Sequence, residues 1–215
     1  MRSTDSHIIT RARQVIAALL FSISLSAGSF SADSVMLEAY RHEDMSVWKQ
    51  HIDTAFLSPL TSNLSPLLYE YGYCGYIVAE AKKEGKETLL PEAKRYVKQF
   101  KQHVEAHKNQ LPKGHYEMYK SAVYVYELRL HESMHPFNAM SLAKEATQLA
   151  PNDPLVLSYY GTSLFYAPKP FGSKSDALRW FEKAQQYFGA AQYRYCWVRD
   201  ANEMYIRQCR EKLKK

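Results

Sequence analysis

The chain has 215 residues, of which 46% are hydrophobic and 13% are aromatic, so it can bury a substantial core and is not a disordered polypeptide. It contains only eight glycines and nine prolines, which argues against a β-sandwich or barrel with many turns. The formal net charge is +6, but basic residues are dense only in the C-terminal REKLKK, which is typical of a solvated helix end. The charge pattern therefore does not indicate nucleic-acid binding.

The first 29 residues have the pattern of a secretory signal peptide. Arg2, Arg11 and Arg13 precede an apolar stretch at 15–25, and small residues surround Ser29, after which we expect cleavage. The apolar stretch is shorter than the roughly 20 residues that span a membrane. We therefore expect a periplasmic or secreted protein, with no transmembrane segment in the mature chain and a net charge lowered from +6 to +4 by the loss of three arginines and one aspartate.

Beyond this segment, apolar residues recur at helical spacing along the whole chain, which predicts an all-α fold. The expected helices cover residues 34–56, 66–84, 92–109, 115–130, 138–150, 154–166, 173–188 and 196–213. The stretch YEYGYCGY in the second helix alternates with a period of two and could form a strand, but the helical pattern of YIVAEAKKE favours a helix. Asp153 is expected to cap the helix that starts at Pro154, and GSKS at 172–175 to cap the next one.

Small residues mark an internal repeat with a period near 34 residues. Two helices carry residues at the same spacing, namely Ala139, Ala143 and Ala146 on one, and Ala177, Phe181 and Ala184 on the other, after allowing for a linker about four residues longer at PKPFGSK. This pattern resembles the tetratricopeptide repeat (TPR), whose small residues let paired helices approach closely. Residues 167–184 also loosely resemble the TPR-like component associated with some TRAP transporters.

The resemblance implies that antiparallel helix pairs stack as a short right-handed α-solenoid. Its repeats would span about 66–112, 116–153 and 154–189 of a single domain, residues 30–215, with flanking helices at both ends. Ala146 and Ala184 would be buried between helices. The first helix of each pair would line a concave groove, whose candidate residues are Tyr69, Tyr76, Ser121, Tyr124, Leu128, His131, Ser158, Thr162, Phe165 and Tyr166. Each of these tyrosines could equally face the core.

A groove of this kind suits a non-catalytic scaffold or binding protein for a peptide, a protein or a small ligand. The alternative is an accessory subunit of an envelope transport or assembly system. A deep closed pocket would favour ligand binding, whereas a shallow open groove would favour a protein partner. We expect no catalytic residue, no metal and no cofactor.

The sequence HESMH at 131–135 matches the H-E-x-x-H motif of zinc peptidases, in which two histidines on one helix face bind the metal. Pro136 disfavours helical geometry at His135, and Arg129 is charged where the motif has an uncharged residue. No histidine follows His135 as a third ligand. We therefore interpret the match as coincidence and keep a zinc metallopeptidase as a remote alternative.

The remaining candidates for metal or redox chemistry are isolated. His103 and His107 lie four residues apart on a lysine-rich face, which predicts a solvated surface, with a structural zinc as the alternative. Cys74 could form a disulfide with Cys196 or Cys209 in an exported protein. The last two cannot pair with each other if one helix carries both, because thirteen residues rise roughly 20 Å.

Overall fold

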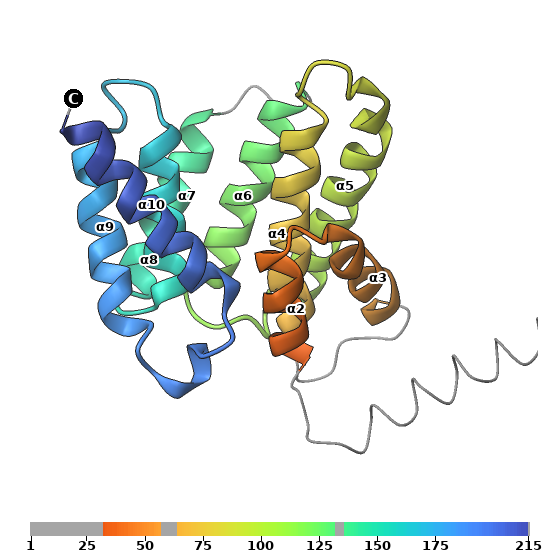
Figure 1. Ribbon diagram of the computed structural model, residues 1–215, viewed down its shortest axis with the longest axis horizontal. Coiled ribbons are helices and arrows are strands. Elements are labelled where there is room, and N and C mark those ends of the chain that lie inside the picture. Colours follow the sequence, from red (N-terminus) through yellow and green to blue (C-terminus); the bar gives the residue numbers. More distant parts are fainter. Residues whose placement is uncertain (1–31, 57–63, 132–135, 215) are drawn as a thin grey trace, which may run out of the picture. The chain divides into compact units, whose positions relative to one another are not determined.

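The computed structural model describes residues 32–56, 64–131 and 136–214 of the chain (Figure 1). The chain divides into two compact units, residues 1–35 and residues 36–215. In the first unit the described part is the opening of helix α2, at residues 32–35. The second unit contains the hydrophobic core. The expected signal peptide at 1–29 lies outside the described residues.

The described residues form helices and no strand, so the prediction of an all-helical fold is confirmed. The α-helices are α2 (Ala32–Arg41), α3 (Met45–Ala55), α4 (Ser65–Glu80), α5 (Leu90–His107), α6 (His115–Arg129), α7 (Pro136–Leu149), α8 (Pro154–Tyr166), α9 (Lys174–Tyr187) and α10 (Trp197–Leu213), with short 3-10 helices η1 (Glu87–Leu89) and η2 (Ala191–Tyr193). Among these described helices, none combines the length and the apolar character needed to cross a bilayer.

The expected helix over residues 34–56 is wrong, because the chain turns between α2 and α3. Glu43 has a φ of 57°, in the left-handed region that cannot continue a right-handed helix. The amide of Asp44 donates to the carbonyl of Ala39 at 2.8 Å and closes the turn. The other expected helices form within a few residues of their predicted ends, and YEYGYCGY lies inside α4 as predicted.

Both predicted helix caps form. The Asp153 carboxylate accepts hydrogen bonds from the amides of Leu155 and Val156, at 2.9 and 3.2 Å. Ser173 accepts one from the amide of Asp176 at 3.0 Å, at the start of α9. These side chains bond to backbone N–H groups that have no partner within their own helix.

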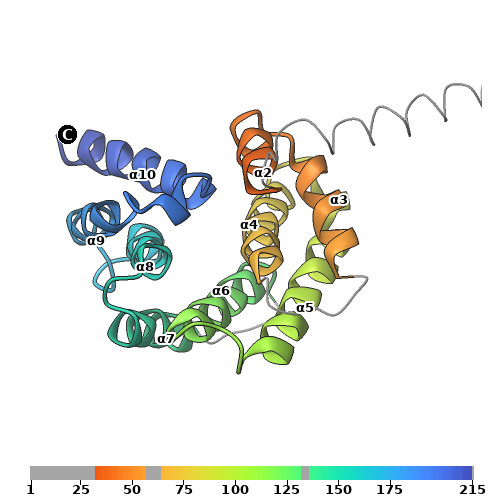
Figure 2. The ribbon, with the colours of Figure 1, turned by 90° about the horizontal axis from the view of Figure 1, so that it is seen from below.

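Within residues 36–215, each helix from α3 to α10 packs on the next, and α4, α6 and α8 also contact one another in order. In Figure 2 these three helices lie on the inner side of the row, and α5, α7 and α9 lie on the outer side. Small residues sit where paired helices touch. Ala146 and Ala184 are fully buried, as expected, and a Cβ on Gly161 would lie 2.8 Å from the Phe181 ring. Glycine therefore permits the close approach of α8 to α9.

The structure shows no disulfide between Cys74 and either Cys196 or Cys209. Cys74 and Cys209 are buried thiols, and neither forms a disulfide in the structure. Burial raises the pKa of the Cys74 thiol well above its ordinary value. Cys74 therefore acts as a small apolar core residue.

Candidate functional site

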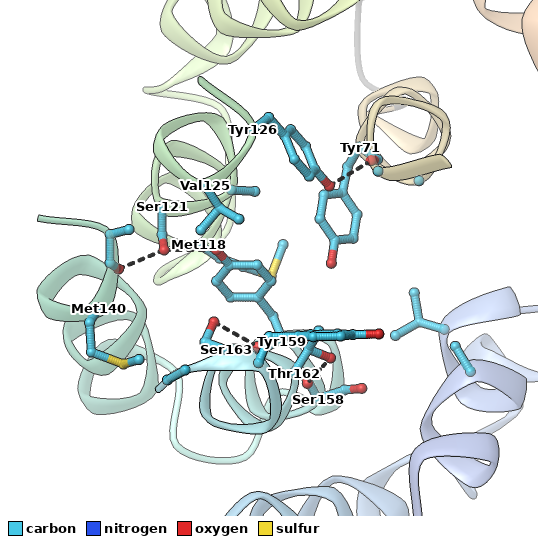
Figure 3. A pocket seen from close by; sticks show the side chains of 18 of the residues that line it. Tyr71, Met118, Ser121, Val125, Tyr126, Met140, Ser158, Tyr159, Thr162 and Ser163 are labelled. Atoms are coloured by element: carbon cyan, nitrogen blue, oxygen red, sulfur yellow. Dashed lines mark hydrogen bonds between the residues drawn. The ribbon is translucent and has the colours of Figure 1, made fainter. Parts of the chain in front are cut away.

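A cavity of about 780 Å³ lies among the helices of the second unit (Figure 3). Its lining comes from α2, α4, α6, α7, α8, α10 and the segment 167–171 that links α8 to α9. Most of the lining side chains are aromatic or aliphatic. The volume is within the range of pockets that enclose small organic ligands.

Tyr71 on α4 occupies the centre of an aromatic cluster in the cavity wall. Its ring centroid lies 6.0 Å from those of Tyr119, Tyr159 and Trp197, and 6.3 Å from that of Tyr126. Burial is the main reason that the pKa of Tyr71 is raised well above its ordinary value, and it raises the pKa of Tyr159 to about 12. These phenols are therefore neutral hydrogen-bond donors over the physiological pH range.

Most hydroxyl groups in the lining are already committed to other partners. Ser121 donates to the carbonyl of Ala139 at 2.7 Å, so its 2.8 Å contact with Tyr159 must use the proton of the tyrosine. Thr162 and Ser163 donate to carbonyls one turn back along α8, at 3.0 and 3.1 Å. Such bonds hold the hydroxyls against their own helix.

The Tyr71 hydroxyl differs from these groups. Tyr126 donates to the backbone carbonyl of Tyr71 at 3.0 Å, while the Tyr71 hydroxyl has no hydrogen-bond partner among the described residues. Figure 3 shows this hydroxyl pointing toward Tyr159 and the open space of the cavity. It is a free donor for an acceptor group on a bound molecule.

Exposed aromatic side chains surround the cavity where it meets solvent. Phe137 at the start of α7 and Phe171 in the linker pack edge to face, with centroids 5.5 Å apart, and they are 69% and 52% exposed. The hydroxyls of Tyr166 and Tyr205 lie 3.3 Å apart. The guanidinium carbon of Arg129 lies 6.0 Å from the centroid of the Tyr166 ring. These five residues all belong to the cavity lining, and together they are called the mouth here.

The charge in the lining has one sign. Among the described residues, the charged side chains that line the cavity are Arg129 and Lys144, and no aspartate or glutamate does so. Both cations are exposed to solvent. The entrance to an otherwise apolar cavity is therefore positively charged.

Helix α10 is held over the cavity by contacts with the first helices of the unit. Trp197, its first residue, packs on Tyr40 of α2 and Trp48 of α3, with centroids 5.5 and 5.2 Å apart. A Cβ on Gly72 would lie 2.4 Å from Trp48 and 2.8 Å from Trp197, so α4 can meet both indoles only with glycine there. Tyr40, Gly72 and Trp197 all belong to the cavity lining, so these contacts form part of its wall.

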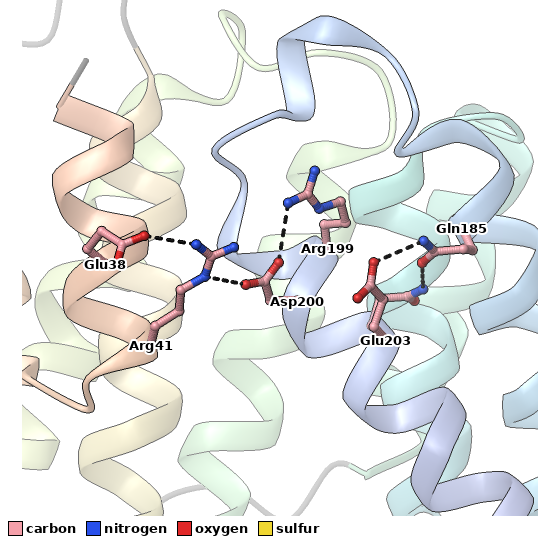
Figure 4. A network of polar contacts seen from close by, with 7 residues as sticks. Glu38, Arg41, Gln185, Arg199, Asp200 and Glu203 are labelled. Carbon is pink, nitrogen blue, oxygen red and sulfur yellow. Dashed lines mark hydrogen bonds and ion pairs between the residues drawn. The ribbon is translucent and has the colours of Figure 1, made fainter. Parts of the chain in front are cut away.

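Polar contacts also hold α10 against its neighbours (Figure 4). Arg41 on α2 donates to Asp200 on α10 at 2.8 Å. Asn202 is fully buried, and its side-chain amide donates at 3.0 Å to the carbonyl of Phe181 and to the side chain of Gln185. Helix α10 is therefore bonded to α2 on one side and to α9 on the other.

The structure brings part of the predicted groove together at this cavity. Ser121, Leu128, Ser158, Thr162 and Tyr166 all belong to its lining. Tyr69, Tyr76, Tyr124, His131 and Phe165 do not.

The five residues outside the lining lie elsewhere for identifiable reasons. Tyr69 is 2% exposed and packs against Trp48. Phe165 is also buried, beneath the ammonium group of Lys174 at 3.6 Å. Tyr76 is partly exposed beside Tyr73, on a face of α4 away from the lining.

Tyr124 is displaced by the register of α6. Met118, Ser121, Val125 and Leu128 line the cavity, and their spacing of three and four residues defines one helix face. Tyr124 lies about 100° around the helix from Val125, at the edge of this face, where it is half-buried. His131 follows the end of α6 with a φ of 59° and is exposed.

Sequence reasoning missed the aromatic residues at the centre of the site, Tyr71, Tyr159, Trp197 and Tyr205. A signal for Tyr71 was present in the sequence. Gly72, Gly75 and Ala79 form a stripe of small residues on α4, and the structure places this stripe in the cavity wall together with Tyr71. Tyr69 and Tyr76 lie outside that stripe.

The zinc motif lies mostly outside the described residues, at 132–135. Helix α6 ends at Arg129, and the left-handed backbone of His131 cannot belong to a right-handed helix that continues from it. Among the described residues, no three His, Cys, Asp or Glu side chains are grouped so that they could hold a metal ion.

His103 is not on a solvated surface as expected. Its Nδ1 lies 3.0 Å from both carboxylate oxygens of Glu70, a fully buried residue of α4, and its ring stacks on Phe56 at 3.8 Å. His107 contacts the backbone carbonyl of His103 at 2.8 Å. His103 therefore joins α5 to α4, whereas His107 bonds within α5.

In comparisons with protein-family models, with curated proteins and with solved structures, nothing matched the chain.

Proposed function

We propose that the protein is a non-catalytic, TPR-like binding protein that holds a small, largely apolar ligand in the cavity. The observation that carries this proposal is the cavity itself, which is lined by aromatic side chains from six helices and contains the hydroxyl of Tyr71, for which the described part of the chain supplies no partner. Apolar walls supply most of the binding free energy in such pockets, and a few polar groups fix the orientation of the ligand.

The arrangement of the helices supports the TPR-like part of the proposal. Helix pairs α4–α5, α6–α7 and α8–α9 follow one another, and their first members contact one another. Small residues such as Gly161 and the repeat residue Ala184 lie where the paired helices touch. Export to the periplasm remains a proposal that rests on the sequence of residues 1–29.

The state of the polar groups supports binding rather than catalysis. The hydroxyls of Ser121, Thr162 and Ser163 donate to backbone carbonyls, so none is paired with a base that would activate it as a nucleophile. The buried tyrosines are held neutral by desolvation. The cavity thus offers donors and apolar surface to a ligand.

Binding of the neutral fluorophore N-phenylnaphthylamine tests this function, since its emission rises on transfer from water to an apolar site. We expect the purified protein to bind it with one site per chain. Val125→Trp places a large ring in the cavity and should remove most of the signal. Tyr124→Trp, on the adjacent position outside the cavity, is the matched control and should leave binding intact. No saturable binding, or equal loss in both variants, would contradict the proposal.

A second candidate is an accessory subunit of an envelope transport or assembly system. The exposed pair Phe137 and Phe171 at the mouth favours it, because exposed apolar groups beside a ligand entrance are suited to a partner that delivers or receives the ligand. Both functions use the same cavity. They differ in whether ligand exchange needs a second protein.

A further inference from the structure

We propose that the ligand is an anionic amphiphile, an apolar chain or ring system that ends in a carboxylate, and that Arg129 binds this head group at the mouth. The inference rests on the proposed function, because it requires the cavity to be the ligand site. It adds the chemical class of the ligand and the residue that selects it.

The charge of the lining favours an anionic ligand. Arg129 and Lys144 both line the cavity, and neither forms an ion pair or a side-chain hydrogen bond with another described residue. Elsewhere in the described chain many cations are paired with acids, for example Lys101 with Glu127 at 2.8 Å. Two cations without acidic partners beside an apolar cavity favour an anion and disfavour a cation.

The surroundings of Arg129 place hydrogen-bond donors beside its positive charge. Its guanidinium lies over the ring of Tyr166, whose hydroxyl shares one hydrogen bond with that of Tyr205. Only one of the two phenol protons can lie between the oxygens, so the other is available to an acceptor. Burial is the main reason that the pKa of Tyr205 is raised, and the positive charge of Arg129 partly opposes this rise. The guanidinium and the phenols therefore act on the same part of the mouth.

A carboxylate fits this combination. A guanidinium can bind both carboxylate oxygens in one plane, and a phenol can donate to either oxygen. The apolar remainder of the molecule would then extend toward the aromatic interior at Tyr71 and Val125. Arg129 also stands in the last turn of α6, where a cation is favourable for the helix, so the experiment must separate a ligand role from this structural one.

Calorimetric titration with decanoate, decanol and decylamine makes this separation, because the three probes share one chain and differ in head group. At about pH 8 the acid is ionised and the amine is protonated. We expect decanoate to bind about tenfold more tightly than decanol, with decylamine weakest, as one charge-assisted hydrogen-bonded contact implies.

The same titrations are repeated with three variants: Arg129→Gln, Arg129→Lys and the control Arg207→Gln. Arg129→Gln should lower the affinity for decanoate to that for decanol and leave decanol binding unchanged, whereas Arg129→Lys should keep part of the preference. Arg207 is exposed on α10 and does not line the cavity, so Arg207→Gln removes the same charge and should change nothing.

Equal affinity of the wild-type protein for decanoate and decanol, or tighter binding of decylamine, would overturn the inference while the proposed function stands. A preference for decanoate that survives Arg129→Gln would overturn the assignment of the head group to Arg129. Failure of all three probes and of N-phenylnaphthylamine to bind would overturn both proposals together.

Discussion

Asp153 illustrates how one side chain can serve two structural roles. Its carboxylate caps α8 through two backbone amides and also accepts a hydrogen bond from His115 Nε2 at 2.8 Å. Burial acts to raise the pKa of Asp153, but the hydrogen bond and charge of His115, together with the two amides, hold it below its ordinary value. The ionised form of Asp153 therefore stabilises the fold.

This lowered pKa predicts how stability depends on pH. A carboxyl whose pKa is lower in the folded state contributes stability that is complete above about pH 4 and is lost as the pH falls through the folded value. Asp153→Asn keeps a capping oxygen but removes the charge, so it should lower the free energy of unfolding by about 1 kcal/mol at neutral pH. Its stability should also fall less steeply than that of the wild type below about pH 4.

Urea unfolding at several pH values checks this prediction, with Glu84→Gln, an exposed carboxylate, as the control. A variant whose stability falls with acid as steeply as the wild type would mean that Asp153 is not a source of the acid sensitivity.

The register of α6 shows where residue-level prediction from sequence reaches its limit. Periodicity identifies the helix but leaves open which of two adjacent residues faces a cavity. Tyr124 and Val125 differ by about 100° around the helix, and only Val125 lines the cavity. An aromatic residue suits both a binding surface and a half-buried helix flank, so composition could not decide between them.

At the scale of elements, the contact between α4 and α5 contains a buried ionisable pair. Glu70 is fully buried, and its carboxylate faces His103 of α5 at 3.0 Å. Burial raises the pKa of Glu70, and the hydrogen bond and charge of His103 act against this rise. The histidine thus compensates a carboxyl group that would otherwise be poorly solvated.

Replacing His103 tests whether the buried carboxyl of Glu70 depends on it. We expect His103→Leu to destabilise the protein by about 3 kcal/mol at neutral pH, because Glu70 loses its partner. A carboxyl with a raised pKa costs least when it is protonated, so the loss should shrink as the pH is lowered toward about 5. The double variant Glu70→Leu with His103→Leu should be more stable than His103→Leu alone. Denaturation of the wild type and these two variants at two pH values tests this, and a loss that is equal at both would contradict an ionic role for the pair.

The boundary between α2 and α3 marks a second limit of sequence reasoning. Helix α3 buries Met45, Trp48 and Ile52, and α2 buries Met36. The helical spacing of apolar residues therefore continues through the turn without a visible break in the sequence. No glycine or proline marks the turn. The left-handed conformation falls on Glu43, a residue type that gives no such signal.

At the scale of the whole described unit, local patterns predicted all but one of the expected helices, two of their caps and the small residues between paired helices. The wall that α10 adds to the cavity could not be predicted in the same way. It depends on Trp197 meeting Tyr40 and Trp48, which are about 150 positions away in the sequence. Periodicity reports which face of a helix is apolar but not which distant helix covers it. The sequence therefore predicted part of the lining but not the contribution of α10.

The central claim is that the cavity holds an apolar ligand with its head group at the mouth. A crystal structure of the protein with decanoate brominated at the end of its chain tests this claim most directly, because anomalous scattering locates the bromine. We expect a bromine peak inside the cavity near Tyr71 and Val125, with carboxylate density beside Arg129. Bromine found only on the outer surface, or a carboxylate placed away from Arg129 with the chain reversed, would contradict it.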